Sequence, residues 1–384
     1  MSIYTAENEQ VSLFELLAQL IEAGGSDLHL TTNTPPQIRV DGALRPLDNY
    51  RPLTGEDTKR LIYGVMTDLQ KRRFEEQLEL DFSISVRGLS RFRVNVFDQR
   101  GGHGAVFRVI PFEIKSFDEL GLPASVGKLC ELPRGLVLVT GPTGSGKTTT
   151  LAAMIDKING DRREHIITVE DPIEYIHSHK GCIVNQREVG INTHGFADAL
   201  RTALRQDPDV VLVGELRDLE TIEQALRISE TGQLTFATLH TNSAATTINR
   251  VIDVFPANQQ SQVRSQLAMV LEGILSQVLL PRADGRGRVM ALEILVPNPA
   301  IRNLIREDKV HQIYPMMLTG QDKSRMQTLN QSLAVLLRQG LITFQKAAEQ
   351  SPHAEELHEM TQSAAEQRGA RATQEGRQPT PIAL

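Results

Sequence analysis

A glycine-rich stretch near the middle of the chain carries the residue types that bind phosphate. Gly141, Gly146, Lys147 and Thr148 fit the pattern G-x-x-x-x-G-K-[ST], in which glycines let the backbone curl so that its N–H groups point at a phosphate. The Lys147 ammonium can reach the β- and γ-phosphates of a nucleotide, and the Thr148 hydroxyl can bind Mg²⁺. The residues predicted to contact the nucleotide are Gly141, Pro142, Thr143, Gly144, Ser145, Gly146, Lys147, Thr148 and Thr149.

The elements around this stretch occur in the order that the motif requires. Residues 136–139 form a short apolar run, which is typical of a strand buried on both faces. A helical pattern over 149–158 follows directly, so the partial positive charge of its N-terminus faces the anion. A chance glycine-rich turn would lack this context. The sequence therefore predicts a site for a nucleoside triphosphate with Mg²⁺, although no motif that reads the base is visible.

A second strand of the same region ends in an acidic residue. The apolar run 210–213 is followed by Gly214 and Glu215. In many phosphate-loop ATPases an Asp at the end of this strand holds Mg²⁺, but here Gly214 occupies that position and the acid is Glu215. Glu215 could bind Mg²⁺ directly or through water. The alternative is a structural ion pair with Arg217.

Two further strand ends carry groups that could take part in hydrolysis. The strand expected at 165–169 runs into Glu170 and Glu174. Hydrolysis of a phosphoanhydride needs an oriented water, which either carboxylate could polarise, and solvent-facing loop acids are the alternative. The strand expected at 234–238 is followed by His240. This histidine could sense a γ-phosphate through a hydrogen bond, or have a structural role.

Periodicity and composition predict two domains, a linker and a tail. Residues 1–112 are typical of an α+β domain with a mainly antiparallel sheet, and 113–133 of a linker with short helices. Residues 134–350 alternate strands and helices, which indicates an α/β domain with a parallel sheet. We expect this domain to end in a helical tract from about 258 to 337. Residues 351–384 contain few large apolar side chains and are expected to be a disordered or partly helical tail.

The N-terminal domain carries a basic strand. Thr54 begins a T-x-x-D capping box, which predicts a helix running to about Leu69. Arg91 and Arg93 lie two residues apart on a predicted strand and share one face, while the apolar residues that alternate with them face the core. Arg108 lies on the next strand. From spacing alone, solvated arginines opposite a buried face are the favoured interpretation.

Composition excludes several classes of protein. The formal net charge is −6, tryptophan is absent and aromatic residues make up 4%, so we expect no nucleic-acid partner. Cys130 and Cys182 form no C-x-x-C motif, and two isolated thiols suit a reducing cytoplasm. We find no basic-then-apolar leader and no apolar run long enough to span a membrane.

Four segments, in order, resemble the Walker A, Asp, Walker B and His boxes of the secretion-type ATPase family, which includes type II secretion and type IV pilus motors. They are residues 141–150, 168–175, 211–218 and 236–242. The resemblance extends from about residue 10 to about residue 350. It implies a PAS-like α+β domain followed by a RecA-like ATPase domain with a trailing helical subdomain, assembled into a ring hexamer with ATP between subunits.

The same resemblance implies roles for individual residues. Glu174 becomes the water-activating residue, Glu215 the acid on the Mg²⁺ side and His240 the γ-phosphate sensor. Three arginines become candidate arginine fingers that reach the phosphates of a neighbouring subunit. They are Arg91, Arg93 and Arg108.

Residues 300–307, Ala-Ile-Arg-Asn-Leu-Ile-Arg-Glu, resemble the signature of the pilus retraction motors in this family. Assembly and type II secretion motors typically carry a further N-terminal domain and a tetracysteine motif, and neither is seen here. The resemblance thus implies ATP-driven retraction, with twitching motility as its outcome, at the cytoplasmic face of the inner membrane. A pilus platform protein and a paralogous retraction ATPase are the implied partners.

Other functions stay open at this point. Within the family, the alternatives are an accessory retraction ATPase and a pilus assembly or type II secretion ATPase. From other classes, the alternatives are a nucleic-acid translocase and a nucleotide-gated scaffold that does not hydrolyse ATP.

Overall fold

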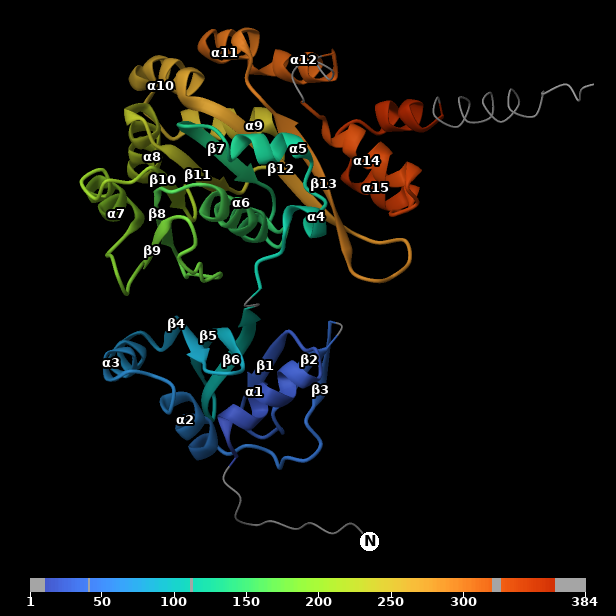
Figure 1. Ribbon diagram of the computed structural model, residues 1–384. Helices are drawn as coiled ribbons and strands as arrows, with labels where there is room; N and C mark the ends of the chain where they lie inside the picture. Colours follow the sequence, from blue (N-terminus) through green and yellow to red (C-terminus); the bar gives the residue numbers. More distant parts are fainter. Residues whose placement is uncertain (1–10, 41, 111–112, 320–325, 363–384) are drawn as a thin grey trace, which may run out of the picture. The chain divides into compact units, whose positions relative to one another are not determined.

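The computed structural model describes residues 11–40, 42–110, 113–319 and 326–362 (Figure 1). The chain forms two compact units. The first comprises Met1–Ile114 together with Pro172–Ile176, and the second comprises Lys115–Asp171 and His177–Leu384. We describe each unit by itself.

The first unit is built on a six-stranded antiparallel sheet in the order β3-β2-β1-β6-β5-β4. Its strands are β1 (Asp27–Leu30), β2 (Gln37–Val40), β3 (Ala43–Pro46), β4 (Glu79–Val86), β5 (Ser90–Gln99) and β6 (Gly102–Ile110). Alternate strand residues such as Phe92, Val94 and Phe107 are fully buried and join the apolar sides of the helices in one core. The predicted antiparallel sheet, with its basic and apolar faces on β5, is confirmed.

Three helices complete this core: α1 (Leu13–Glu22), α2 (Gly55–Tyr63) and α3 (Asp68–Gln77). Thr54 and Asp57 form the predicted capping box at the start of α2. The prediction that this helix continues to about Leu69 is wrong, because α2 ends before Gly64. Thr67 then begins a second capping box with Gln70 and starts a separate helix. The apolar residues of both helices follow one periodic pattern, which concealed the break.

The second unit contains a seven-stranded sheet in the order β13-β12-β7-β11-β10-β8-β9. The strands from β12 to β9 run parallel, and β13 is antiparallel to β12. They are β7 (Gly135–Thr140), β8 (His165–Glu170), β9 (Ile183–Glu188), β10 (Val210–Val213), β11 (Leu234–Leu239), β12 (Leu271–Pro281) and β13 (Arg288–Leu295). Because β7 lies between β11 and β12, the loop that follows it is held at the middle of the sheet.

Both faces of this sheet are covered by helices, as predicted. Leu136 and Leu138 of β7 belong to one apolar core, and Val137 and Val139 belong to the core on the opposite face. The covering helices are α4 (Phe117–Leu120), α5 (Ala124–Leu129), α6 (Lys147–Asp161), α7 (Phe196–Ala203), α8 (Leu219–Thr231), α9 (Ala244–Asp253), α10 (Ala257–Val270) and α11 (Pro299–Arg306). The alternation explains why every residue of β7 is buried.

The expected helical tract over about 258–337 is wrong in its middle, which forms β12 and β13. The apolar residues of β12 recur at helical spacing, at Leu271, Ile274, Leu275, Val278 and Leu279. The strand is nevertheless extended, because it is covered on both faces and so needs no strict alternation. A register shift between Leu271 and Gly273 also disturbs its period.

The segments at the two ends of the second unit pack against its cores. The stretch 113–133, expected to be a linker with short helices, contains α4 and α5, and Val126 and Leu129 are buried in a core of this unit. Within the expected tail, residues 354–362 are helical, and Leu357 is buried with α14 (Leu329–Arg338) and α15 (Phe344–Gln350). The rest of that expected tail, 363–384, lies outside the described residues.

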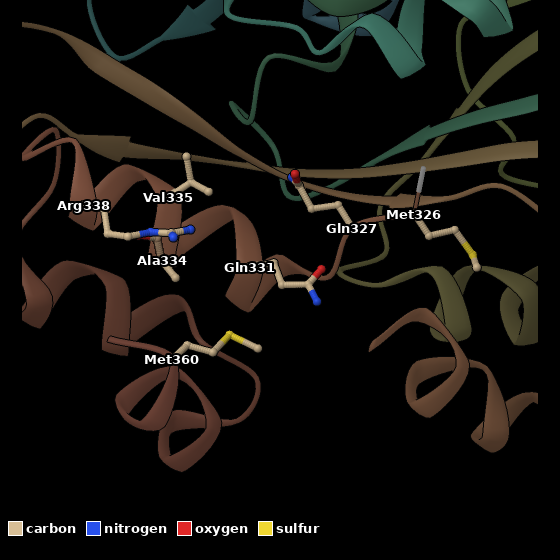
Figure 2. Close-up of a pocket in the computed structure, with 7 residues that line it drawn as sticks. All are labelled: Met326, Gln327, Gln331, Ala334, Val335, Arg338 and Met360. Carbon is tan, nitrogen blue, oxygen red and sulfur yellow. The ribbon is translucent and has the colours of Figure 1, made fainter. Parts of the chain in front are cut away.

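Beside α14 the surface is hollowed by a pocket of about 340 Å³ (Figure 2). It is lined by Met326, Gln327, Gln331, Ala334, Val335, Arg338 and Met360. The preceding helix α12 (Ile313–Thr319) completes the C-terminal helical part. In the part of the chain that the structure describes, none of the helices has the length and apolar character needed to cross a membrane.

Candidate phosphate-binding site

The glycine-rich loop begins where β7 leaves the sheet. Thr140, the last residue of β7, is hydrogen-bonded to Ser276 of β12, with 2.7 Å between the hydroxyl oxygens. The next residue, Gly141, has a φ of 143°, a backbone conformation that side chains disfavour. A Cβ at this position would also overlap the carbonyl oxygen of Gln277 and the hydroxyl of Ser145. Glycine is therefore required for the chain to turn this closely against β12.

Helix α6 starts directly after the loop and leaves its N-terminus available to an anion. Gly146 precedes the helix with a φ of 89° and has no side chain that could cap it. The first amide N–H groups of a helix have no partner within the helix and carry its partial positive charge. With 15 residues, α6 is long enough to develop that charge. The loop and the helix end thus fit the phosphates of a nucleotide.

Lys147 is folded back over the loop. Its side chain is largely buried, with 9% exposed. The ammonium donates hydrogen bonds to the carbonyl oxygens of Gly141 at 2.8 Å and Pro142 at 3.1 Å. The ammonium is therefore positioned above the curled backbone, at the place where the motif requires a positive charge.

A histidine joins Lys147 to the acidic residue after β10. The Nδ1 atom of His240 is 3.4 Å from the Lys147 ammonium, and its Nε2 atom is 3.2 Å from Glu215. An ammonium can only donate, so this geometry makes Nδ1 the acceptor and places the ring proton on Nε2, facing the Glu215 carboxylate. His240 thus contacts both Lys147 and Glu215.

Glu215 is held ionised by its surroundings. Burial opposes ionisation, but Arg217, 2.7 Å away, and His240 outweigh it and lower the pKa of Glu215 below its ordinary value. The two alternatives considered from the sequence, a structural ion pair and a metal-side acid, are therefore not exclusive. Both carboxylate oxygens already have partners, so a Mg²⁺ ion would be held by Glu215 through water or by replacing one contact.

The donors available for Mg²⁺ are few. Thr148 follows Lys147 at the start of α6, and Glu215 is the nearby carboxylate. Among the described residues, no group of three or more His, Cys, Asp or Glu could hold a metal ion. The residues therefore fit a Mg²⁺ ion that is bound mainly by nucleotide phosphates and water.

The two candidate bases lie in different surroundings. Glu170, at the end of β8, is buried and accepts hydrogen bonds from Thr168 at 2.6 Å and Gln186 at 3.2 Å. These contacts fix Glu170 within the sheet. Glu174 belongs to Pro172–Ile176, which groups with the first unit, so its distance from the phosphate loop stays undefined.

The three arginines lie on one face of the first unit's sheet. Arg91 is buried and donates a 2.6 Å hydrogen bond to Ser83. Arg93 and Arg108 are paired directly across β5 and β6. Two like charges facing each other are unfavourable, and Asp27, 2.8 Å from the Arg108 guanidinium, offsets this repulsion. Arg93 and Arg108 line a hollow of about 420 Å³ on this face.

One residue at the loop was missed from the sequence. Gln277 of β12 is 1% exposed, and its amide donates a 2.7 Å hydrogen bond to the carbonyl oxygen of Ser145. It was missed because residues 271–281 were expected to be helical. The available signal was the polar pair Ser276 and Gln277 between apolar residues.

The model for the family described as "Type II/IV secretion system protein" matches residues 7–349. The chain belongs to this family. It is 53% identical over 341 residues to the type IV pilus retraction ATPase PilT of Pseudomonas aeruginosa, covering 89% of this chain and 98% of that protein. It is 44% identical over 346 residues to the type IV pilus ATPase PilU of the same organism, covering 90% of each.

A solved structure agrees with this family. The crystal structure of the pilus retraction motor PilT with bound ADP matches with a TM-score of 0.86 and 54% identity, covering 91% of this chain and 99% of that one. The predictions of a secretion-type ATPase, of its α/β fold and of its resemblance to the retraction motors are therefore confirmed. The roles of the individual site residues stay predictions.

Replacing Lys147 with Ala should lower ATP hydrolysis by about 100-fold or more, because a preorganised charge at the phosphates is lost. Phosphate release measures this. Lys157→Ala is the matched control, since Lys157 lies on the same helix and forms an exposed ion pair with Asp161. Turnover at the parental rate in the Lys147 variant would contradict the assignment of the phosphate loop.

Proposed function

We propose that this secretion-family protein is a hexameric, Mg²⁺-dependent ATPase that retracts type IV pili and so drives twitching motility. The observation that carries the proposal is the complete phosphate-loop site in a chain that matches PilT over nearly the full length of both proteins. The bound ADP named for the related PilT structure supports ATP as the nucleotide.

In the proposed mechanism, the loop amides and Lys147 bind the β- and γ-phosphates. Thr148 and Glu215 are the residues that would hold Mg²⁺, Glu215 through water. When bound, the metal neutralises charge on the phosphates. His240 contacts both Lys147 and Glu215, so a change in the charge near the γ-phosphate position alters both of its hydrogen bonds. This geometry supports the sensing role.

Glu174 is the proposed base that orients and deprotonates the attacking water. Glu170 is less suited, because its buried carboxylate already accepts two hydrogen bonds within the sheet. The proposal for Glu174 rests on the family resemblance of the Asp box.

Arg93 and Arg108 are the proposed arginine fingers, with Arg91 less accessible because it is buried against Ser83. In a ring, an arginine from one subunit would neutralise charge on the nucleotide of its neighbour only when the subunits close. Hydrolysis and product release would then reopen the interface. This coupling would turn nucleotide turnover into movement.

We place the motor at the cytoplasmic face of the inner membrane, where it would act on the pilus platform protein. The absence of a membrane-crossing helix among the described residues fits an attachment through partners. The similarity to PilU supports a paralogous retraction ATPase as a further partner. We propose that the protein has no nucleic-acid partner, because its formal net charge is −6.

Deletion of the gene, followed by microscopy of surface pili, tests the direction of force. We expect long pili that do not retract and a loss of twitching motility, both restored by the parental gene. A strain that carries Lys147→Ala in place of the parental gene tests whether retraction needs ATP hydrolysis. A lack of surface pili would contradict retraction and would instead indicate an assembly ATPase.

Glu174→Gln should bind ATP with the parental affinity but hydrolyse it about 100-fold or more slowly, because the water loses its base. Equilibrium binding and single-turnover hydrolysis separate the two effects. Glu223→Gln, at an exposed position of α8, is the matched control. Parental hydrolysis by the Glu174 variant would place the base elsewhere.

Arg108→Ala should lower hydrolysis about 1,000-fold, the smaller end of the range for arginine fingers. If the arginine acts on a neighbour, mixing this variant with Lys147→Ala should restore part of the activity. Some interfaces of the mixed rings would combine an intact loop with an intact Arg108. Mixtures no more active than the separate variants would argue against action across the interface.

A further inference from the structure

Gln277 lies at the point where the phosphate loop leaves the sheet. Ser276 of β12 is paired in register with Thr140, the last residue of β7. Gln277, the next residue, is therefore level with Gly141. Its backbone carbonyl oxygen lies where a Cβ of Gly141 would be, and its side-chain amide donates a 2.7 Å hydrogen bond to the carbonyl oxygen of Ser145.

The same amide also lies against the end of the loop. A Cβ at Gly146 would come within 3.3 Å of the Gln277 Nε2 atom. Gln277 thus adjoins Gly141 through its backbone carbonyl, and Ser145 and Gly146 through its buried side-chain amide.

A glutamine at this position lowers the stability of the fold. Among the residues that the structure describes, neither the Oε1 atom of Gln277 nor the hydroxyl of Ser145 has a hydrogen-bond partner, and both are buried. A buried polar atom without a partner destabilises a fold. The neighbours of Gln277 along β12 are mostly apolar, so an apolar residue would satisfy the packing. The glutamine is better explained by what it does to the loop.

The contact at Ser145 fixes the direction of a neighbouring N–H group. A peptide unit is planar and trans, so the C=O of Ser145 and the N–H of Gly146 point in opposite directions. The hydrogen bond from Gln277 draws the carbonyl toward β12 and so turns the Gly146 N–H away from β12. Because Gly146 has a φ of 89°, which glycine adopts without strain, this peptide could otherwise flip.

We propose that Gln277 is a positioning residue that holds the Ser145–Gly146 peptide in the orientation that binds nucleotide phosphate. The proposal rests on the assignment of residues 141–149 as the phosphate loop. Gln277 does not touch the reacting atoms. It acts by keeping an amide donor aimed at the anion, so that the loop does not have to reorganise when nucleotide binds.

Gln277→Met tests this in the full-length protein, because methionine has a similar shape but makes no hydrogen bond. We expect the Kd for ATP, measured with a fluorescent ATP analogue and Mg²⁺, to rise about tenfold, the effect of one hydrogen bond. We expect a melting temperature no lower than that of the parent, since the unpaired Oε1 is removed. A loss of affinity without a loss of stability is the signature of positioning.

Gln327→Met is the matched control. Gln327 also donates a 2.7 Å hydrogen bond from its amide to a backbone carbonyl, that of Leu292, but it lies beside the pocket of Figure 2. This variant should keep the parental Kd. Gln277→Glu provides a second variant of unchanged shape, in which a carboxylate faces the Ser145 carbonyl. Its Kd should rise at least as much as that of Gln277→Met.

Two outcomes would overturn the proposal. One is a parental Kd in both Gln277 variants, and the other is an equal loss of affinity in the Gln327 control. Failure of the underlying site is distinguishable, because Lys147→Ala would then bind the ATP analogue as tightly as the parent does, whatever the Gln277 variants do.

Discussion

The phosphate site depends on holding several backbone N–H groups in a fixed orientation. Buried amides normally find a partner within the protein, and a loop that binds phosphate must leave some of them available to the anion. The chain fixes the loop by burying the elements that support it. Every residue of β7 is buried between β11 and β12, and the Gly141 turn is pressed against the carbonyl of Gln277. The rigidity of the loop therefore comes from the sheet.

The charges around the loop form one connected row. The Lys147 ammonium binds the carbonyls of Gly141 and Pro142, His240 links it to Glu215, and Arg217 balances that carboxylate. An incoming phosphate competes with these two neutral carbonyls for the ammonium. A phosphate oxygen is charged, so its hydrogen bond with the ammonium is stronger than the bonds to the two carbonyls. His240 Nδ1 lies 3.4 Å from the ammonium, so a change in the position of the ammonium would alter this contact.

The sequence predicted those parts of the molecule that short segments determine. The phosphate loop, the acids after β8 and β10 and the capping box at Thr54 each lie within about eight residues, and the structure contains them all. It did not predict β12, because the spacing of its apolar residues is also that of a helix. The strand is formed by pairing with β13 on one side and with β7, more than 130 residues earlier, on the other. Gln277 lies on this strand and was missed for the same reason. The distance of Glu174 from the loop is likewise undetermined by local pattern, since its segment groups with the other unit.

On the polar face of the first unit's sheet, aspartates offset the repulsion between neighbouring guanidinium groups. In one row across the strands, Asp27 faces Arg39 on one side and Arg108 on the other, and Arg108 faces Arg93. Burial alone would raise the pKa of Asp27, but Ser26 and Arg108 outweigh it and lower the pKa below its ordinary value, so the carboxylate stays charged.

One buried carboxylate thus orients Arg108 while its side chain stays 66% exposed. The hollow on this face is lined by three arginines against two aspartates. His29 adds no charge at neutral pH, because burial lowers its pKa. The lining of the hollow therefore keeps one positive charge in excess, and the Arg108 guanidinium is already held in place by Asp27. The ion pair with Asp27 already restricts the rotamers of Arg108 before an anion binds. Binding an anion would therefore cost little additional side-chain entropy. This is the condition for an arginine to act on a phosphate at a small cost in binding energy.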